Sequence, residues 1–199
     1  MIAVIDYGMG NLYSIYNALQ KVGADAEVIS DAAKIDSADG VLIPGVGSFG
    51  DGMRNLKPFI PDLLKFIESG KPVLGICLGL QMFFESSEES DSEGLGIMKG
   101  EVKLLPKTVR IPQMGWNSIK VLRQTPLFEG VKRGDFFFFA HSYHCVPNEK
   151  VSVAEVEYGR RITVAVKKGN VYGVQFHPEK SGAKGLTIMK NFADICGGK

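Results

Sequence analysis

The amino-acid sequence predicts an α/β fold with three layers, in which a largely parallel central sheet carries an antiparallel extension. The first part of the chain alternates short apolar runs, typical of buried parallel strands, with segments of helical periodicity. The later part contains many short strand-like runs separated by Gly, Pro and Asn. The 199 residues, 45% of them hydrophobic, contain no repeat and no linker, so we expect one domain over residues 1–199.

The first elements are expected in the order strand, helix, strand, strand, helix, strand. Residues 2–5 are an apolar run, and residues 11–22 carry apolar side chains at helical spacing before Gly23, which is placed to end that helix. Further elements are expected over 27–30, 41–43 and 72–76 as strands and over 61–69 as a helix. This alternation predicts a parallel sheet covered on both faces.

The remaining elements are mostly strands. An acidic stretch, ESSEESDSEG at residues 85–94, is expected to be a solvated loop. The strand-like runs that follow are GEVKLL, TVRI, NSIKVL, DFFFFAHSY, VSVAEVEY, ITVAVKKGN and VYGVQF. We expect the four phenylalanines of DFFFFAHSY to lie on a buried strand with aromatic side chains on both faces. A final helix is expected from Gly182, with Leu186, Met189 and Phe192 on one face.

Charge and hydropathy exclude several classes of partner. The chain has 23 Lys and Arg against 22 Asp and Glu, so no long-range field attracts nucleic acid or an anionic membrane. No apolar run approaches the roughly 20 residues of a membrane span, and the start MIAVIDYGMG lacks the features of a signal peptide. We therefore expect a cytoplasmic protein with no nucleic-acid and no membrane partner.

The cysteines predict neither a disulfide framework nor a metal site. Cys77, Cys145 and Cys196 are widely spaced and form no C-x-x-C pair. His141 and His144 would point to opposite faces of one strand and, with Cys145, match no closed zinc pattern. A special role for a cysteine is therefore expected to be chemical rather than structural.

One cysteine has the sequence context of a nucleophile. Gly75-Ile76-Cys77-Leu78-Gly79 has the form G-x-nucleophile-x-G, with a strand before it and a helix-compatible run after it. Small residues on both sides are required where a sharp strand-to-helix turn holds the nucleophile in a strained conformation. At the start of a helix, free backbone N–H groups favour a thiolate and can receive an oxyanion. The alternative is that Cys77 is only a small core residue.

A base for this nucleophile is found near the C-terminus. In VYGVQFHPEKS, an alternating strand ends at Phe176, and His177-Pro178-Glu179 follows. A cysteine nucleophile needs a base that later acts as an acid, and that base needs a partner to fix its tautomer. His177 and Glu179 supply both, although an ordinary polar pair on the surface is the alternative interpretation.

The combination of GICLGLQ and HPE resembles the class I, or triad-type, glutamine amidotransferases, in which Cys, His and Glu hydrolyse the side-chain amide of glutamine. The segments DYGMGNL, IPGVGSFG, PQMGWN and HSYHC extend the resemblance over nearly the whole chain, to the glutaminase subunits of imidazole glycerol phosphate synthases of histidine biosynthesis. The resemblance implies a flavodoxin-like fold, L-glutamine as substrate and no cofactor or metal. It also implies a heterodimer with a cyclase subunit, a β/α barrel that makes imidazole glycerol phosphate and AICAR from the ammonia delivered to it.

The resemblance also implies roles for individual positions. Cys77 matches the nucleophile, His177 the general base and acid, and Glu179 the group that orients the histidine. The oxyanion hole of the family matches Gly45, Val46, Gly47 and Leu78. Its substrate site matches Gln81, Ser142 and Tyr143, and its partner interface matches Asn11, Trp116 and Lys180. The sequence departs from the family pattern at Gln113, where that pattern has histidine.

Other functions remain to be weighed against this one. Gly45 to Gly50 also has the G-x-G-x-x-G spacing of a dinucleotide-binding turn, which would indicate an oxidoreductase. That fingerprint belongs on the first strand-to-helix turn, with an acidic residue at the end of the next strand, whereas here the glycines follow the third expected strand and the next one ends at Cys77. A non-catalytic binding subunit, and a glutaminase serving a pyridoxal phosphate or purine synthase, are further alternatives.

Overall fold

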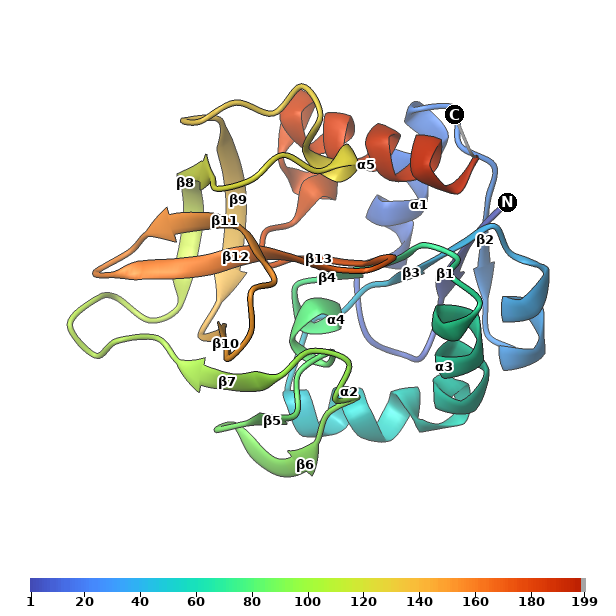
Figure 1. Cartoon of the computed structure of the whole chain (residues 1–199), viewed down its shortest axis with the longest axis horizontal. Helices are drawn as coiled ribbons and strands as arrows, with labels where there is room; N and C mark the ends of the chain where they lie inside the picture. The colour runs from blue at the N-terminus through green and yellow to red at the C-terminus, as the bar shows by residue number, and fades with distance from the viewer. Residues whose placement is uncertain (198–199) are drawn as a thin grey trace.

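The central strands are parallel and confirm the predicted α/β class. The structure is a computed structural model that describes residues 1–197 (Figure 1). The parallel part of the sheet has the order β2 (Ala26–Ile29), β1 (Ile2–Ile5), β3 (Gly40–Ile43), β4 (Val73–Ile76) and β13 (Val171–Val174). Apart from the edge strand β2, which contains Glu27 and an exposed Val28, these strands are fully buried, which agrees with their lack of charged residues.

Helices cover both faces of this sheet. On one face lie α1 (Leu12–Lys21) and α5 (Gly182–Cys196), and on the other lie α2 (Phe49–Leu56) and α3 (Ile60–Glu68), above and below the sheet in Figure 1. Successive residues of a strand point to opposite faces. Val4 therefore joins the core under α1 and α5, whereas Ile5 joins the core under α2 and α3.

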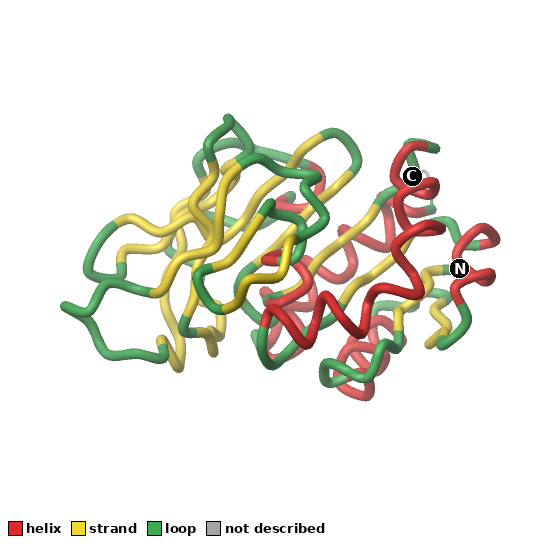
Figure 2. The backbone as a smooth tube through the Cα atoms, turned by 90° about the horizontal axis from the view of Figure 1, so that it is seen from below, coloured by secondary structure: helices red, strands yellow, loops and turns green. Residues whose placement is uncertain are grey.

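The antiparallel extension begins at β12 (Arg161–Lys168), which pairs antiparallel with β13. From β12 the sheet continues through β10 (Tyr143–Pro147), β7 (Gly100–Leu104), β5 (Ser86–Ser87) and β6 (Ser90–Glu93). A branch from β12 consists of β11 (Ser152–Glu157), β8 (Gln113–Val121) and β9 (Phe136–His141). In Figure 2 these strands gather at the end of the molecule away from the N-terminus.

Three local predictions were wrong, and one helix was missed. The acidic stretch 85–94 is not a loop, because β5 and β6 form a hairpin within it. TVRI (108–111) forms turns instead of a strand, with the Val109 N–H bonded to the Pro106 carbonyl. DFFFFAHSY is interrupted at Ser142, so His141 and His144 lie on different strands, β9 and β10. The helix α2 was not expected.

The phenylalanine run also differs from its prediction. Phe137 and Phe139 are fully buried, but Phe136 is 57% exposed and Phe138 is half-buried. Burial alternates along β9, so one of its faces packs on the core while the other lies nearer to solvent.

Candidate active site

Cys77 lies on a sharp turn between β4 and the single-turn helix α4 (Leu78–Gln81). Its φ of 55° makes it the one non-glycine residue with positive φ among residues 1–197. The flanking glycines are required by space, because a Cβ on Gly75 would lie 2.6 Å from the Gly79 carbonyl, and one on Gly79 would lie 2.1 Å from the Ile43 oxygen. The strand-turn-helix arrangement is as predicted, although the helix contributes only one turn.

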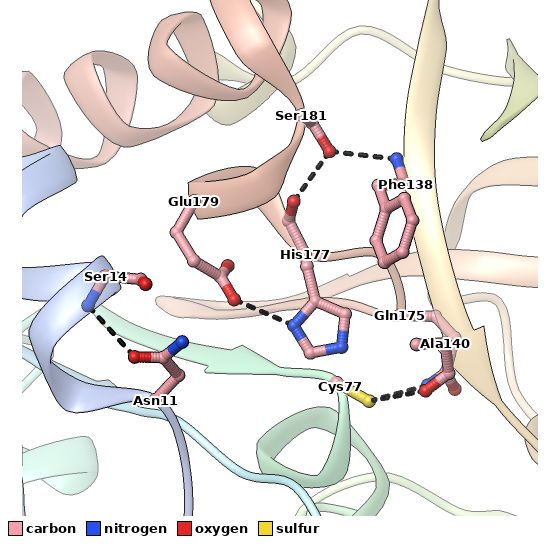
Figure 3. A network of polar contacts seen from close by, with 9 residues as sticks. All are labelled: Asn11, Ser14, Cys77, Phe138, Ala140, Gln175, His177, Glu179 and Ser181. Atoms are coloured by element: carbon pink, nitrogen blue, oxygen red, sulfur yellow. Dashed lines mark hydrogen bonds and ion pairs between the residues drawn. The ribbon is translucent and has the colours of Figure 1, made fainter. Parts of the chain in front are cut away.

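His177 and Glu179 meet Cys77 from the end of β13 (Figure 3). The His177 Nδ1 atom is 2.8 Å from Glu179 Oε1, and both side chains are almost completely buried. A carboxylate only accepts, so Nδ1 carries the hydrogen and Nε2 is the ring nitrogen left for Cys77. Burial alone would lower the pKa of His177, but hydrogen bonding to Cys77 and to Glu179 outweighs burial and raises it to about 10. These two partners therefore favour the charged imidazolium form of His177.

A serine fixes the backbone of the histidine. Ser181 Oγ donates to the His177 carbonyl at 2.6 Å and accepts from the Phe138 N–H at 2.9 Å. The His177 N–H donates in turn to the Phe138 carbonyl at 2.9 Å. The three bonds, of which Figure 3 draws the two made by Ser181, attach the H-P-E turn to β9. Sequence reasoning missed Ser181, whose partner is distant along the chain.

A cavity of about 270 Å³ opens beside the Cys77 sulfur. It is lined by residues that the sequence analysis assigned to the oxyanion hole or to the substrate site: Val46, Gly47, Leu78, Gln81, Ser142 and Tyr143. It also contains one acidic residue that sequence reasoning missed, Glu89, from the turn between β5 and β6. The acidic composition around Glu89 predicted a solvated loop. The hairpin of β5 and β6 brings the Glu89 carboxylate to the cavity, and the local sequence did not indicate this hairpin.

The loop after β3 has little in common with a dinucleotide-binding turn. Gly45 is buried against Tyr7 and Leu78, where a Cβ would lie 2.7 Å from the Tyr7 hydroxyl oxygen, and Gly47 has a φ of 115°. The N-terminus of α2 already holds an anionic group, since Glu89 Oε2 accepts from the Phe49 N–H at 2.7 Å. A pyrophosphate would meet that carboxylate instead of free N–H groups.

Tyr7 holds this loop and was not predicted. Its hydroxyl donates to the Pro44 carbonyl at 2.5 Å. Burial, and to a smaller extent the nearby Cys77, raise the pKa of Tyr7, so the hydroxyl stays a donor at neutral pH.

One predicted oxyanion donor is not free in this conformation, because the Leu78 N–H points to the Gly45 carbonyl at 3.4 Å.

The three predicted interface residues lie around the H-P-E turn. Asn11 caps α1 by accepting from the Ser14 N–H at 3.1 Å and lies beside Glu179 in Figure 3. The Trp116 ring meets the edge of Phe138 at 6.1 Å between centroids, and Lys180 Nζ lies 6.0 Å from the same ring. All three are exposed.

Gln113, the departure from the family pattern, is instead fully buried, and its amide donates to Asn117.

His141 is a buried neutral base at the edge of the cavity. Its Nδ1–H donates to the Tyr143 carbonyl at 2.8 Å, and burial lowers the pKa of His141 to about 4. The unfolded chain takes up this proton near pH 6.5, so the stability of the folded chain falls as pH drops from 6.5 towards 4.

We expect His141→Asn to remove this acid sensitivity. The folded wild type should lose about 2 kcal/mol more unfolding free energy than the variant between pH 7.5 and pH 5, because asparagine keeps an N–H donor but does not titrate. Urea unfolding at both pH values measures this difference. An equal loss in both proteins would show that His141 is not the titrating group.

The described part of the chain shows neither a metal-binding cluster nor a membrane-spanning helix. Over residues 1–197 no group of three or more His, Cys, Asp or Glu side chains is arranged to hold a metal ion. None of the helices in this range has the length and apolar character that crossing a bilayer requires.

The chain belongs to the class-I glutamine amidotransferase family, which residues 3–196 match. It is 47% identical over 205 residues to "Imidazole glycerol phosphate synthase subunit HisH" of Halobacterium salinarum, with 98% of this chain and 93% of the relative covered. It is 49% identical over 199 residues to the protein of the same name from Caldanaerobacter subterraneus subsp. tengcongensis, with 98% of each covered.

Solved structures agree on the fold. A structure titled "Crystal structure of glutamine amidotransferase" superposes with a TM-score of 0.79 at 17% identity and covers 99% of this chain and 100% of that one. PurLQS from Thermotoga maritima superposes with a TM-score of 0.77 at 23% identity, with 96% of both chains covered. At these identities the likeness concerns the fold alone.

Proposed function

We propose that this chain is the cytoplasmic glutaminase subunit of an imidazole glycerol phosphate synthase, which hydrolyses L-glutamine and passes ammonia to a cyclase subunit. The observation that carries the proposal is the meeting of Cys77, His177 and Glu179 at the wall of an amino-acid-sized cavity. The full-length similarity to proteins named HisH supports the choice of synthase.

The geometry accounts for the chemistry of glutamine hydrolysis. The Cys77 thiolate attacks the side-chain carbonyl carbon of glutamine, and the carbonyl π electrons move to oxygen. Protonated His177 gives its Nε2 proton to the departing nitrogen, so that ammonia leaves and a glutamyl thioester remains. Neutral His177 then takes a proton from water, whose oxygen attacks the thioester to release glutamate. Glu179 stabilises the imidazolium and fixes its tautomer throughout.

The oxyanion requires free N–H donors, but one of the expected donors, the Leu78 N–H, is bonded to the Gly45 carbonyl. We expect the peptide between Gly45 and Val46 to turn during activation, so that the Leu78 N–H is released and the Val46 N–H faces the reacting carbonyl. Gly47, with its positive φ, can absorb such a rotation. One oxyanion donor is worth about 3 kcal/mol, so this movement would change turnover roughly a hundredfold.

The amino-acid end of glutamine fits the polar wall of the cavity. Ser142 and Tyr143 offer backbone and hydroxyl groups, and Glu89 offers the negative charge that an α-ammonium group requires. Glu89 uses Oε2 on the Phe49 N–H, so Oε1 remains for the substrate.

Glu89→Gln is expected to raise the KM for glutamine roughly 10- to 100-fold with a smaller change in kcat, because the lost charge interacts equally with ground state and transition state. Glutamine still accepts from Phe49, so the α2 cap is retained. Steady-state kinetics measure both constants. Asp91→Asn, an exposed isosteric change in the same hairpin, should change neither. A lowered kcat at unchanged KM would contradict this role.

The partner is expected to dock around the H-P-E turn. Asn11, Trp116 and Lys180 are exposed there, and the exposed Met114 connects this region to the cavity. A β/α-barrel cyclase bound at this face would receive ammonia without its release to solvent. We expect one copy of each subunit to associate as a heterodimer.

Glutaminase activity measured with and without a cyclase subunit and its nucleotide ligand tests the proposal. We expect the pair to stimulate glutamate release from glutamine strongly. Stimulation only by a pyridoxal phosphate or purine synthase would reassign the partner and keep the amidotransferase chemistry. No glutamate release with any synthase would remove the function altogether.

A further inference from the structure

A buried chain of amides joins the Cys77 sulfur to strand β10. Gln175 follows β13 and is 0% exposed, two residues before His177. Its Nε2 atom is 3.6 Å from Cys77 Sγ, a hydrogen-bonding distance for sulfur, and Figure 3 shows both residues at the site. Its Oε1 accepts from Gln81 Nε2 at 3.1 Å, and the same Gln81 nitrogen donates to the Tyr143 carbonyl at 2.9 Å.

The direction of every hydrogen bond in this chain is fixed at the Tyr143 end. A backbone carbonyl only accepts, so the Gln81 atom that faces Tyr143 must be the amide nitrogen. The second hydrogen of that nitrogen points to Gln175, whose facing atom must therefore be Oε1. The NH₂ group of Gln175 is consequently left to face the sulfur. A flipped Gln175 amide would place two donors against each other at Gln81.

A third polar neighbour of the sulfur, besides Gln175 and His177, is an acceptor and favours the opposite protonation state of Cys77. The Ala140 carbonyl lies 4.0 Å from Cys77 Sγ and could accept only from a thiol S–H. The contact to the Gln175 amide is shorter and supplies a donor, which favours the negatively charged form of the sulfur.

We propose that Gln175 is a further active-site residue, whose amide holds the Cys77 sulfur as a thiolate and aims it at the cavity. The inference rests on the proposed function, in which Cys77 is the nucleophile. Gln175 differs from His177 because its N–H donor is permanent, whereas the histidine loses its proton to ammonia during each turnover. Through Gln81 the amide also ties the sulfur to Tyr143, in the segment expected to hold the substrate.

Alkylation of the full-length chain by iodoacetamide tests this role independently of glutamine hydrolysis. The Cys77 thiolate displaces iodide and forms a thioether, so the rate follows the thiolate fraction; mass spectrometry of the Cys77 peptide separates it from the other cysteines. Gln175→Leu should move the midpoint of the rate–pH profile up by about one pH unit, which is roughly tenfold slower alkylation at a fixed pH below both midpoints. Gln175→Met, which keeps the side-chain length without a donor, should move it the same way, and covers the case in which the leucine variant fails to fold.

Asn191→Leu is the matched control. The Asn191 amide donates to the Leu127 and Glu129 carbonyls away from the sulfur, so its loss should leave the alkylation midpoint unchanged. A folded Gln175→Leu or Gln175→Met variant with the wild-type midpoint would overturn the proposal. If the wild type also hydrolyses glutamine, that result removes only the role of Gln175. If the wild type hydrolyses none with any synthase, the proposed function fails while the alkylation profile still reports on Gln175.

Discussion

Replacing Cys77 with alanine is expected to reduce glutamine hydrolysis by about 10⁴-fold or more, because the reaction then loses its only route through a thioester. His177→Ala should have a similar effect, since His177 is the imidazole hydrogen-bonded to Cys77 and therefore the expected proton donor to the departing ammonia. The fold should persist in both variants. Alanine at residue 77 meets the same φ of 55° as cysteine does, and the lost sulfur is small.

Glutamate release from glutamine in the presence of the cyclase partner measures this effect, and thermal unfolding reports on the fold. Cys196→Ala is the matched control, because Cys196 is a free cysteine on α5 that packs near Gly40, far from the cavity. It should retain wild-type turnover. A Cys77→Ala protein that releases glutamate at the wild-type rate would exclude the covalent mechanism.

The parallel core of the fold could be predicted because each of its elements is specified locally. An uninterrupted apolar run such as residues 2–5 has few alternatives to a strand buried on both faces. Helix α2 could not be predicted in this way, since Gly50 and Gly52 lower its intrinsic helix propensity. Phe49, Met53 and Leu56 form it by packing in the core, and tertiary contacts of this kind are not visible in a local pattern.

Some residues of the candidate site could likewise be predicted from local sequence, whereas others could not. Cys77 and His177 lie in short motifs whose spacing already indicates chemistry. Glu89, Gln175 and Tyr7 reach the site from segments that are distant along the chain: the β5–β6 hairpin, the end of β13 beside β4, and the loop after β1. A glutamine two residues before the histidine was visible on the same face of its strand, and that periodicity was the one available signal for Gln175.

The G-x-G-x-x-G spacing shows how one pattern can serve different purposes. In a dinucleotide-binding turn the glycines let the backbone approach a pyrophosphate. Here Gly45 lets the loop approach Tyr7 and Leu78, and Gly50 lets α2 approach Ser90, where a Cβ would lie 3.2 Å away. Close backbone approach is the shared requirement, and the position after the third strand decides what is approached.

Gly79→Ala is expected to destabilise the protein by about 4 kcal/mol or more, the range of severe overpacking and strain. The added Cβ would lie 2.1 Å from the Ile43 carbonyl oxygen and 3.0 Å from its carbon. These are backbone atoms of a central buried strand, so they cannot move aside as a flexible side chain would. Displacing them would also shift the Pro44–Gly47 loop that follows β3, so Gly79 sets the distance between this loop and the strand-to-helix turn at Cys77.

Urea unfolding of the variant and the wild type measures the loss, with soluble yield as a second readout if the variant does not fold. Gly197→Ala is the control, because its Cβ would meet nothing closer than 3.5 Å and its φ of −82° suits any residue. It should change the unfolding free energy by less than about 0.5 kcal/mol. A Gly79→Ala protein as stable as this control would mean that α4 can move away from β3 at little cost, and the strand-to-helix turn at Cys77 would then not be the rigid support that a positioned nucleophile requires.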